Sequence, residues 1–200
     1  MTATRLLALG IGTLAMACSG GAKSKQGGSM SAMDKKVMVS MKMHDGQPFG
    51  PLEYGADYKD KFKLVSKGKF HSKPHGRRFV EVWVNDIGYD AYTSGKPLPV
   101  GSIIVKPSWQ AKGGKPTTTA GPLFVMVKKP KGYSKEHNDW WYAIHWKHPP
   151  KRFSAGGKGL YWRSPSARVN YCWECHENYD NEVGLPPRAM RAWKQPADGS

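Results

Sequence analysis

Two cysteines and a histidine near the carboxyl end form the pattern with the clearest chemistry. Residues 171–176 read YCWECH, so Cys172 and Cys175 are three positions apart and His176 directly follows the second thiol. Thiols at this spacing can each add across a vinyl group of haem, and the adjoining imidazole is then placed to bind the iron. The pattern predicts one covalently attached c-type haem, held by Cys172 and Cys175, with His176 as an axial ligand of the iron.

Other chemistries use a CxxC pair, and each needs something more. A structural zinc site requires a second pair of ligands, but the only other cysteine is Cys18. A thioredoxin-like redox pair normally follows a strand of a βαβ unit, and no such unit surrounds Cys172. A chance CxxC beside a surface histidine is the third alternative. The haem site is the interpretation that accounts for all three residues.

The amino terminus has the features of a secretion signal. Arg5 precedes an apolar run from Leu6 to Ala17, which is too short to span a bilayer. Small residues then lead into Cys18, as in the lipobox of bacterial lipoproteins, although Ala15 stands where that pattern prefers leucine. We expect residues 1–18 to be a lipoprotein-type signal that ends at a lipidated Cys18, with ordinary cleavage near Ala17 as the alternative. Either route predicts a location outside the cytoplasm, in the periplasm, and lipidation would anchor the protein to a membrane.

Composition indicates a tether followed by one domain. Residues 19–47 are rich in Ser, Gly and Lys, which predicts a flexible basic tether, and residues 48–200 are long enough for one packed domain. The chain carries 31 Lys and Arg against 15 Asp and Glu, a net charge of +16. Because the lysines are scattered along the chain, we expect an acidic redox partner or anionic lipid rather than nucleic acid.

The domain is predicted to be α+β, a mostly antiparallel sheet with a few short helices. The 23 Gly and 15 Pro argue against a helical bundle. A helix that starts near residues 164–166 and ends by Gly184 should carry the haem cysteines on one side. The other expected elements are a helix over 57–70, a strand over 79–84, a short helix within 85–95, a rigid loop over 96–101, a strand over 102–106, a loop over 113–121, and strands over 123–128, 139–147 and 160–163.

Several of these features together resemble the cytochrome P-460 family, small periplasmic monohaem proteins that share a fold with the cytochromes c′-β. The likeness covers about residues 82–177. It rests on the VWVND strand and turn, the short helix that ends in Gly95, the GSIIVK strand of residues 101–106, the WWY strand of residues 140–142, and the CxxCH pattern close to the carboxyl end.

The resemblance implies a role for Lys106. In the enzymatic members a lysine on the strand after the proline-rich loop is linked covalently to the haem macrocycle, and by position that lysine is Lys106. The pattern alone would make Lys106 the solvated end of an apolar strand, on the same face as Ile104. Where enzymatic relatives carry an arginine in an earlier strand, Val80 stands here.

Three functions from different classes follow. The resemblance implies oxidation of hydroxylamine or a related small nitrogen species at an open iron face, electrons passing to an acceptor cytochrome, and a homodimer. Proton removal would then need a base, for which Glu81, His145 and Asp139 are candidates. A second hypothesis is a cytochrome c′-β-like protein that binds nitric oxide or another gas without turnover. The third is an electron carrier, whose iron would need a sixth ligand such as Met126, Met190 or His145.

Overall fold

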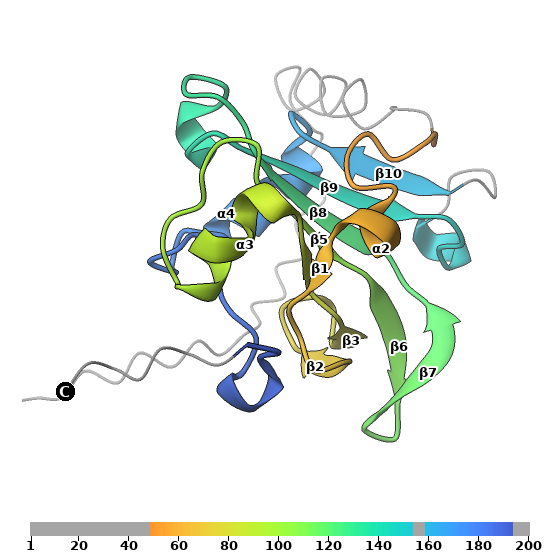
Figure 1. Cartoon of the computed structure of the whole chain (residues 1–200). Helices are drawn as coiled ribbons and strands as arrows, with labels where there is room; N and C mark the ends of the chain where they lie inside the picture. The colour runs from red at the N-terminus through yellow and green to blue at the C-terminus, as the bar shows by residue number, and fades with distance from the viewer. Residues whose placement is uncertain (1–48, 154–158, 194–200) are drawn as a thin grey trace, which may run out of the picture.

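The computed structural model describes residues 49–153 and 159–193, which form two antiparallel sheets with short helices around them (Figure 1). The strands are β1 (Lys63–Leu64), β2 (Phe70–Ser72), β3 (Arg78–Val80), β4 (Trp83–Val84), β5 (Ile103–Lys106), β6 (Ser108–Lys112), β7 (Lys115–Ala120), β8 (Leu123–Lys128), β9 (Trp140–Trp146) and β10 (Leu160–Arg163). The helices are α2 (Tyr58–Lys61), α3 (Asp86–Thr93) and α4 (Asn170–His176), with 3₁₀ turns η1 (Lys135–His137), η2 (Lys151–Phe153), η4 (Ala167–Val169) and η5 (Arg188–Met190). The predicted α+β class is therefore confirmed, including the short carboxyl-terminal helix that carries both cysteines.

The larger sheet has six strands in the order β1-β4-β5-β8-β9-β10. Its register aligns side chains across neighbouring strands: Ile104 pairs with Met126, and Met126 with Tyr142. Two residues further along β5, Lys106 pairs with Phe124, which pairs with Ile144. Because successive side chains of a strand point to opposite faces, these two rows lie on the same face of the sheet.

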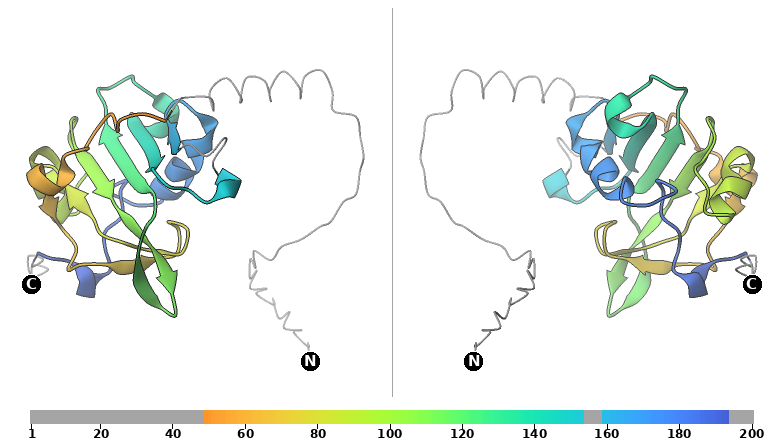
Figure 2. Two further views of the ribbon diagram at one scale, coloured as in Figure 1. Left: turned by 90° about the vertical axis from the view of Figure 1, so that its right-hand side faces the viewer. Right: turned by 90° about the vertical axis from the view of Figure 1, so that its left-hand side faces the viewer.

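Each face of this sheet has its own apolar cluster. Val105, Val125 and Trp141 pack on one face with Tyr58 of α2. On the other face Ile104, Met126 and Tyr142 pack with Tyr92 of α3, and residues of α4 complete that cluster. The side views show α4, in blue, lying across the sheet (Figure 2). The sheet thus separates a face covered by α2 from a face covered by α3 and α4.

The predicted strand over 79–84 is wrong in one respect, because two strands in different sheets share these residues. β3 belongs to the smaller sheet, of order β2-β3-β6-β7, and β4 to the larger one. At the break, the Val82 amide donates to Ser66 Oγ, 3.2 Å away, and its carbonyl accepts from the Val65 amide, 2.9 Å away. The Glu81 amide donates to the carbonyl of Pro107, which separates β5 from β6. The chain therefore passes from one sheet to the other at each of these two points.

The predicted loop over 113–121 is also wrong, since residues 115–120 form strand β7. β7 pairs with β6 across a two-glycine turn, where Gly113 and Gly114 have φ of 56° and 73°. Glycine adopts this left-handed conformation without strain, and paired glycines suit such a hairpin turn. β7 is largely exposed and rich in threonine, so it has no alternating apolar pattern to reveal it.

The two helices predicted at the ends of the domain are shorter than expected. α2 ends at Lys61 rather than near Gly68, because Phe62 is extended and Lys63 then pairs with Val84 of β4. α4 ends at His176, and turns rather than helix lead on to Gly184. None of the helices among the described residues is both long and apolar enough to cross a bilayer. The predicted signal, Cys18 and the tether lie outside the described residues.

Candidate functional site

Helix α4 presents its cysteines and histidine to the sheet. Ser166 begins this segment, its Oγ accepting a hydrogen bond of 3.2 Å from the Arg168 amide in the η4 turn that leads into α4. Residues three apart share one side of a helix, so Cys172 and Cys175 lie together. Both are free thiols, and His176 is buried. The motif therefore sits on a capped helical segment on which His176 is buried, Cys172 half-buried and Cys175 exposed.

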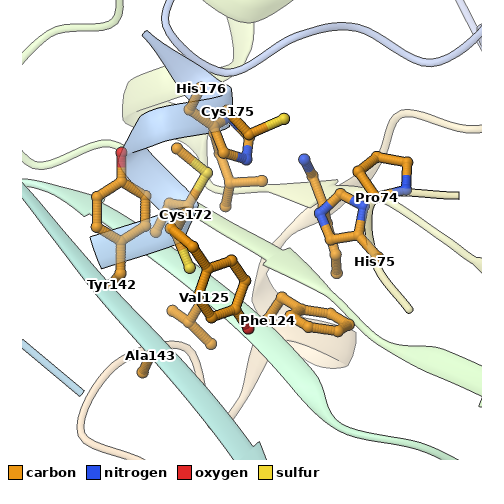
Figure 3. A pocket seen from close by; sticks show the side chains of 13 residues that line it. Pro74, His75, Phe124, Val125, Tyr142, Ala143, Cys172, Cys175 and His176 are labelled. Carbon is orange, nitrogen blue, oxygen red and sulfur yellow. The ribbon is translucent and has the colours of Figure 1, made fainter. Parts of the chain in front are cut away.

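A cavity of about 510 Å³ lies between α4 and strands β5, β8 and β9. Figure 3 shows Cys172, Cys175 and His176 on α4, with His75 facing them across the cavity. The lining is mostly apolar, from the two cross-strand rows of the sheet, the loop before β3 and α4: Pro74, His75, Ile104, Lys106, Phe124, Val125, Met126, Tyr142, Ala143, Tyr171, Cys172, Cys175 and His176. Two further cavities, of about 460 and 740 Å³, also border Pro74 and His75.

Lys106 ends β5 inside this cavity. Its side chain is 7% exposed, so it is not the solvated strand end that the pattern alone suggested. Burial lowers the pKa of Lys106 from 10.5 to about 8, while Cys175 and Cys172 act to raise it. Within residues 49–153 and 159–193 no carboxylate forms an ion pair with it. The site thus holds a desolvated amine without a counter-ion.

The cysteine pair lacks the electrostatics of a redox dithiol. Burial raises the pKa of the Cys172 thiol to about 12, whereas reactive CxxC pairs depend on a lowered thiol pKa. A structural zinc site is not supported either. The part of the chain that the structure describes holds no group of three or more His, Cys, Asp or Glu residues that could bind a metal ion. Neither the redox dithiol nor the zinc site is therefore supported by the structure.

Two imidazoles line the cavity in their neutral form. Burial lowers the pKa of His176 to about 3, helped by the charge of Lys106, and backbone hydrogen bonding at Glu182 and Val183 acts the other way. The pKa of His75 is also lowered well below its usual value by burial, and further by Lys106 and His176. Neutral imidazole is the form that ligates a metal.

A polar atom in the cavity wall lacks a partner. Tyr142 Oη is buried and forms no hydrogen bond with any described residue. Buried polar atoms are nearly always satisfied in folded proteins, so exceptions point to a missing group. An apolar cavity bordered by two thiols, an imidazole and this hydroxyl fits a haem: thioethers would form at Cys172 and Cys175, and His176 would hold the iron.

Other predicted site residues lie elsewhere. Glu81 accepts from the Trp83 indole at 3.4 Å, and Asp139 accepts from the Gly132 and Ser134 amides. His145 is on the opposite face of the sheet, where its Nε2 is 2.9 Å from the Gly50 carbonyl and its ring stacks on Phe49. None of Glu81, Asp139 and His145 lines the three cavities.

Of the predicted sixth ligands of the iron and Val80, some line a cavity and others do not. Met126 lines the main cavity, whereas Met190 lies in the η5 turn and borders none of the three cavities. Val80 lines the second cavity. Cys18 lies outside the described residues. The structure therefore brings together Cys172, Cys175, His176, Lys106 and Met126.

His75 was not among the predicted site residues. Pro74, His75 and Gly76 suggest a turn, and the turn is present, but the sequence gives no sign that it folds over the cavity. A lone histidine between turn residues carries no spacing signal. Only its position in the fold identifies it.

A comparison with known families decides which family the chain belongs to. The profile of the family described as Cytochrome P460 matches residues 55–182, well over half of the chain. The chain is a member of the cytochrome P460 family. Membership makes it a haem protein, and the matched residues include both cysteines, His176, Lys106 and His75. A search of curated proteins gives no match.

Proposed function

We propose that this cytochrome P460 family member carries one haem bound through thioethers at Cys172 and Cys175, with His176 on the iron. Support comes from the position of all three side chains on one capped helical segment at the edge of an apolar cavity. The bound group would supply reversible one-electron chemistry, while the chain holds it in place and shields it from water.

The activity that we propose is oxidation of hydroxylamine or a related small nitrogen species, with electrons passed to an acceptor cytochrome. The observation that carries this proposal is Lys106, which is buried in the same cavity as the cysteines without a carboxylate partner. An unpaired buried lysine costs free energy unless it gains something from the site. A covalent bond to the macrocycle, as in the enzymatic relatives, would account for it.

The surroundings of Lys106 favour such a bond. A pKa of about 8 leaves an appreciable fraction of the amine neutral near pH 7, and a neutral amine is the nucleophilic form. The link replaces one N–H bond and one C–H bond by an N–C bond, so two electrons must leave to an oxidant such as a peroxide. The amine nitrogen is the group that Lys106 contributes.

The apolar lining favours a second candidate, a cytochrome c′-β-like protein that binds nitric oxide without turnover. Ile104, Phe124 and Met126 line the cavity, and no Asp or Glu does so among the described residues. Oxidation of hydroxylamine releases protons, which need an acceptor. Electron transfer alone, the third hypothesis, would need a sixth ligand, and of the three ligands predicted for it only Met126 lines the cavity.

Location and partners complete the proposal. We propose that the protein is a periplasmic lipoprotein anchored through Cys18, because the expected haem attachment takes place outside the cytoplasm. The net charge of +16 suits anionic lipid and an acidic acceptor cytochrome. A homodimer, as the resemblance implies, is part of the same proposal.

The absorption spectrum of the ferrous protein, recorded with and without nitric oxide, tests the proposed activity. A macrocycle linked to Lys106 is expected to give a red-shifted Soret band. A gas binder should give an ordinary c-type spectrum that changes when nitric oxide is added. An electron carrier should give a low-spin spectrum that does not respond to nitric oxide.

The matched variants are Lys106→Leu and Lys112→Leu. Lys106→Leu should abolish the shifted band, whereas Lys112→Leu, at an exposed position on β6, should leave it unchanged. If the shifted band persists in Lys106→Leu, or if the wild-type protein shows no shifted band, the link at Lys106 is refuted. The response of the spectrum to nitric oxide then decides between the gas binder and the electron carrier.

A further inference from the structure

The imidazole of His75 faces that of His176 across the cavity. His75 lies in the loop between β2 and β3, whereas His176 ends α4, so the fold joins residues a hundred positions apart. Both line the main cavity and its neighbour, as Figure 3 illustrates for the main cavity. We infer that His75 is the second axial ligand of the haem iron, opposite His176. This inference rests on the proposed haem attachment and deepens it.

The distance between the two rings favours direct ligation. Their centroids are 6.4 Å apart. A metal–imidazole bond of about 2 Å, with about 1 Å from nitrogen to ring centre on each side, places two ligating rings about 6 Å apart. A small ligand held between the metal and a hydrogen-bonding histidine would separate the rings by about 8 Å or more. The observed separation matches the first arrangement.

The hydrogen bonding of His75 leaves one of its ring nitrogens for ligation. His75 Nδ1 is 2.7 Å from Ser72 Oγ on β2, and no other hydrogen bond to His75 is formed by the residues the structure describes. Nε2 at the tip of the ring is therefore its free nitrogen. Histidines that bind metals typically engage the second ring nitrogen in such a hydrogen bond, which fixes the tautomer and the ring direction. Ser72 is thus a positioning residue for His75.

Packing holds the ring of His75 in this place. It meets Phe124 of β8 edge to face, with centroids 4.9 Å apart. The charged or titratable groups that face it are Lys106 and His176. The ring is thus held by its contact with Phe124 and by the Ser72 hydrogen bond.

Ligation by His75 would control access to the iron. A substrate or gas could bind only after His75 has moved away, so apparent affinity falls by the fraction of molecules in which the iron is open. The loop that carries His75 would act as a gate between an electron-transferring state and a ligand-binding state. None of the sixth ligands predicted from sequence, Met126, Met190 and His145, would be needed.

Electron paramagnetic resonance and absorption spectra of the ferric holoprotein test this inference. The wild-type protein should be six-coordinate and low-spin. His75→Ala should lose the low-spin signal and become high-spin, and added imidazole should restore it. The control His145→Ala changes another half-buried histidine, on the opposite face of the sheet, and should keep the wild-type spectrum. Ser72→Ala should give a mixture, because the ring loses its orienting partner.

Ligand binding provides an independent measurement. If His75 occupies the iron in nine molecules of ten or more, His75→Ala should bind nitric oxide about tenfold more tightly, or better, than wild type. A high-spin wild-type protein, or a low-spin signal that persists in His75→Ala, would overturn the assignment. A pyridine haemochrome assay on each sample separates the two failures: absence of attached haem refutes the proposed function, whereas attached haem with the wrong spin state refutes the role of His75 alone.

Discussion

The two faces of the six-stranded sheet use the same strands for different purposes. On one face His145 is held by the Gly50 carbonyl and two aromatic rings, Phe49 and Tyr161. On the other face His75 and His176 border a cavity, and Lys106 has no counter-ion among the described residues. A satisfied histidine on the first face stabilises the fold. Incompletely satisfied polar groups on the second face indicate a bound group.

The difference arises within single strands. Along β5, Val105 packs into the cluster under α2, while its neighbours Ile104 and Lys106 point into the opposite side. Alternation therefore decides which residues of a strand can serve the site. Substitutions on the cavity face should therefore change haem attachment or the haem spectrum, whereas substitutions on the opposite face should change only the stability of the fold.

The largest expected effect follows removal of the thiols. The double variant Cys172→Ala/Cys175→Ala should lose all covalently bound haem, because no thioether can form. The measurement is haem that stays with the chain on a denaturing gel, together with the pyridine haemochrome. Glu174→Gln, exposed on the same helix between the two cysteines, is the control and should retain the haem. Covalent haem in the double variant would contradict the proposed attachment.

The next effect concerns the stability of the haem-free chain. In the double cysteine variant the Lys106 amine is free, and its pKa is lowered from 10.5 to about 8 by burial. The unfolded chain then binds more protons than the folded one between these values, so stability rises with pH through this window. The total gain should be about 3 kcal/mol. Urea unfolding at pH 7 and pH 10.5 measures it.

Lys106→Met in the same background is the control for this pH dependence. Methionine keeps much of the side-chain volume without a titrating group, so most of the stability gain between pH 8 and 10.5 should vanish. An unchanged gain would mean that another group titrates in this window and that Lys106 is solvated. The cavity would then not contain a buried, unpaired Lys106 charge.

A smaller effect is expected where the loop after α4 is fastened to the sheet. The Glu182 carboxylate is 2.8 Å from Lys128 Nζ and 2.7 Å from the Trp140 indole nitrogen, and it also accepts from the Asn138 amide. Glu182→Ala leaves these donors unpaired and should cost about 1–3 kcal/mol of unfolding free energy. Thermal or urea unfolding measures the loss. A change below about 0.5 kcal/mol would show that the Glu182 network does not stabilise the fold.

Acid should weaken the same network. Burial alone would raise the pKa of Glu182, but hydrogen bonds from Lys128 and Trp140 and the charge of Lys128 lower it below its usual value. The stabilisation is present above the unfolded-state pKa of about 4.5 and is lost as pH falls through the folded-state value. The Glu182→Ala variant should therefore show less loss of stability in acid than the wild type.

The smallest effect tests the face opposite the site. His145→Phe keeps an aromatic ring against Phe49 and Tyr161 but loses the hydrogen bond with Gly50. It should cost about 1 kcal/mol of stability and leave the haem spectrum unchanged. A spectral change as large as that expected for His75→Ala would show that the two faces are not independent.

Much of the site could be predicted from sequence because its signals are local. Spacing alone places Cys172, Cys175 and His176 on one helix, and the strand containing Lys106 has a dense apolar pattern. The burial of Lys106 could not be predicted in this way, since it depends on α4 and the loop of His75 covering the end of β5. The resemblance to a family, rather than the pattern, singled it out.

Non-local pairing explains what the sequence did not reveal. β7 is a polar strand that exists because it pairs with β6, and residues 78–84 divide because Ser66 and Val65 bind the backbone of Val82. Such breaks depend on partners distant in the chain, which short-range periodicity does not detect. His75 belongs with these features, since only the fold brings it opposite His176.

The most direct test of a haem held between α4 and β5 is mass spectrometry of peptides from the digested holoprotein. A haem bridging these elements predicts one branched species, in which a peptide with Cys172 and Cys175 and a peptide with Lys106 are joined through a single haem. Release of the Lys106 peptide unmodified, or of both cysteines as free thiols, would contradict it.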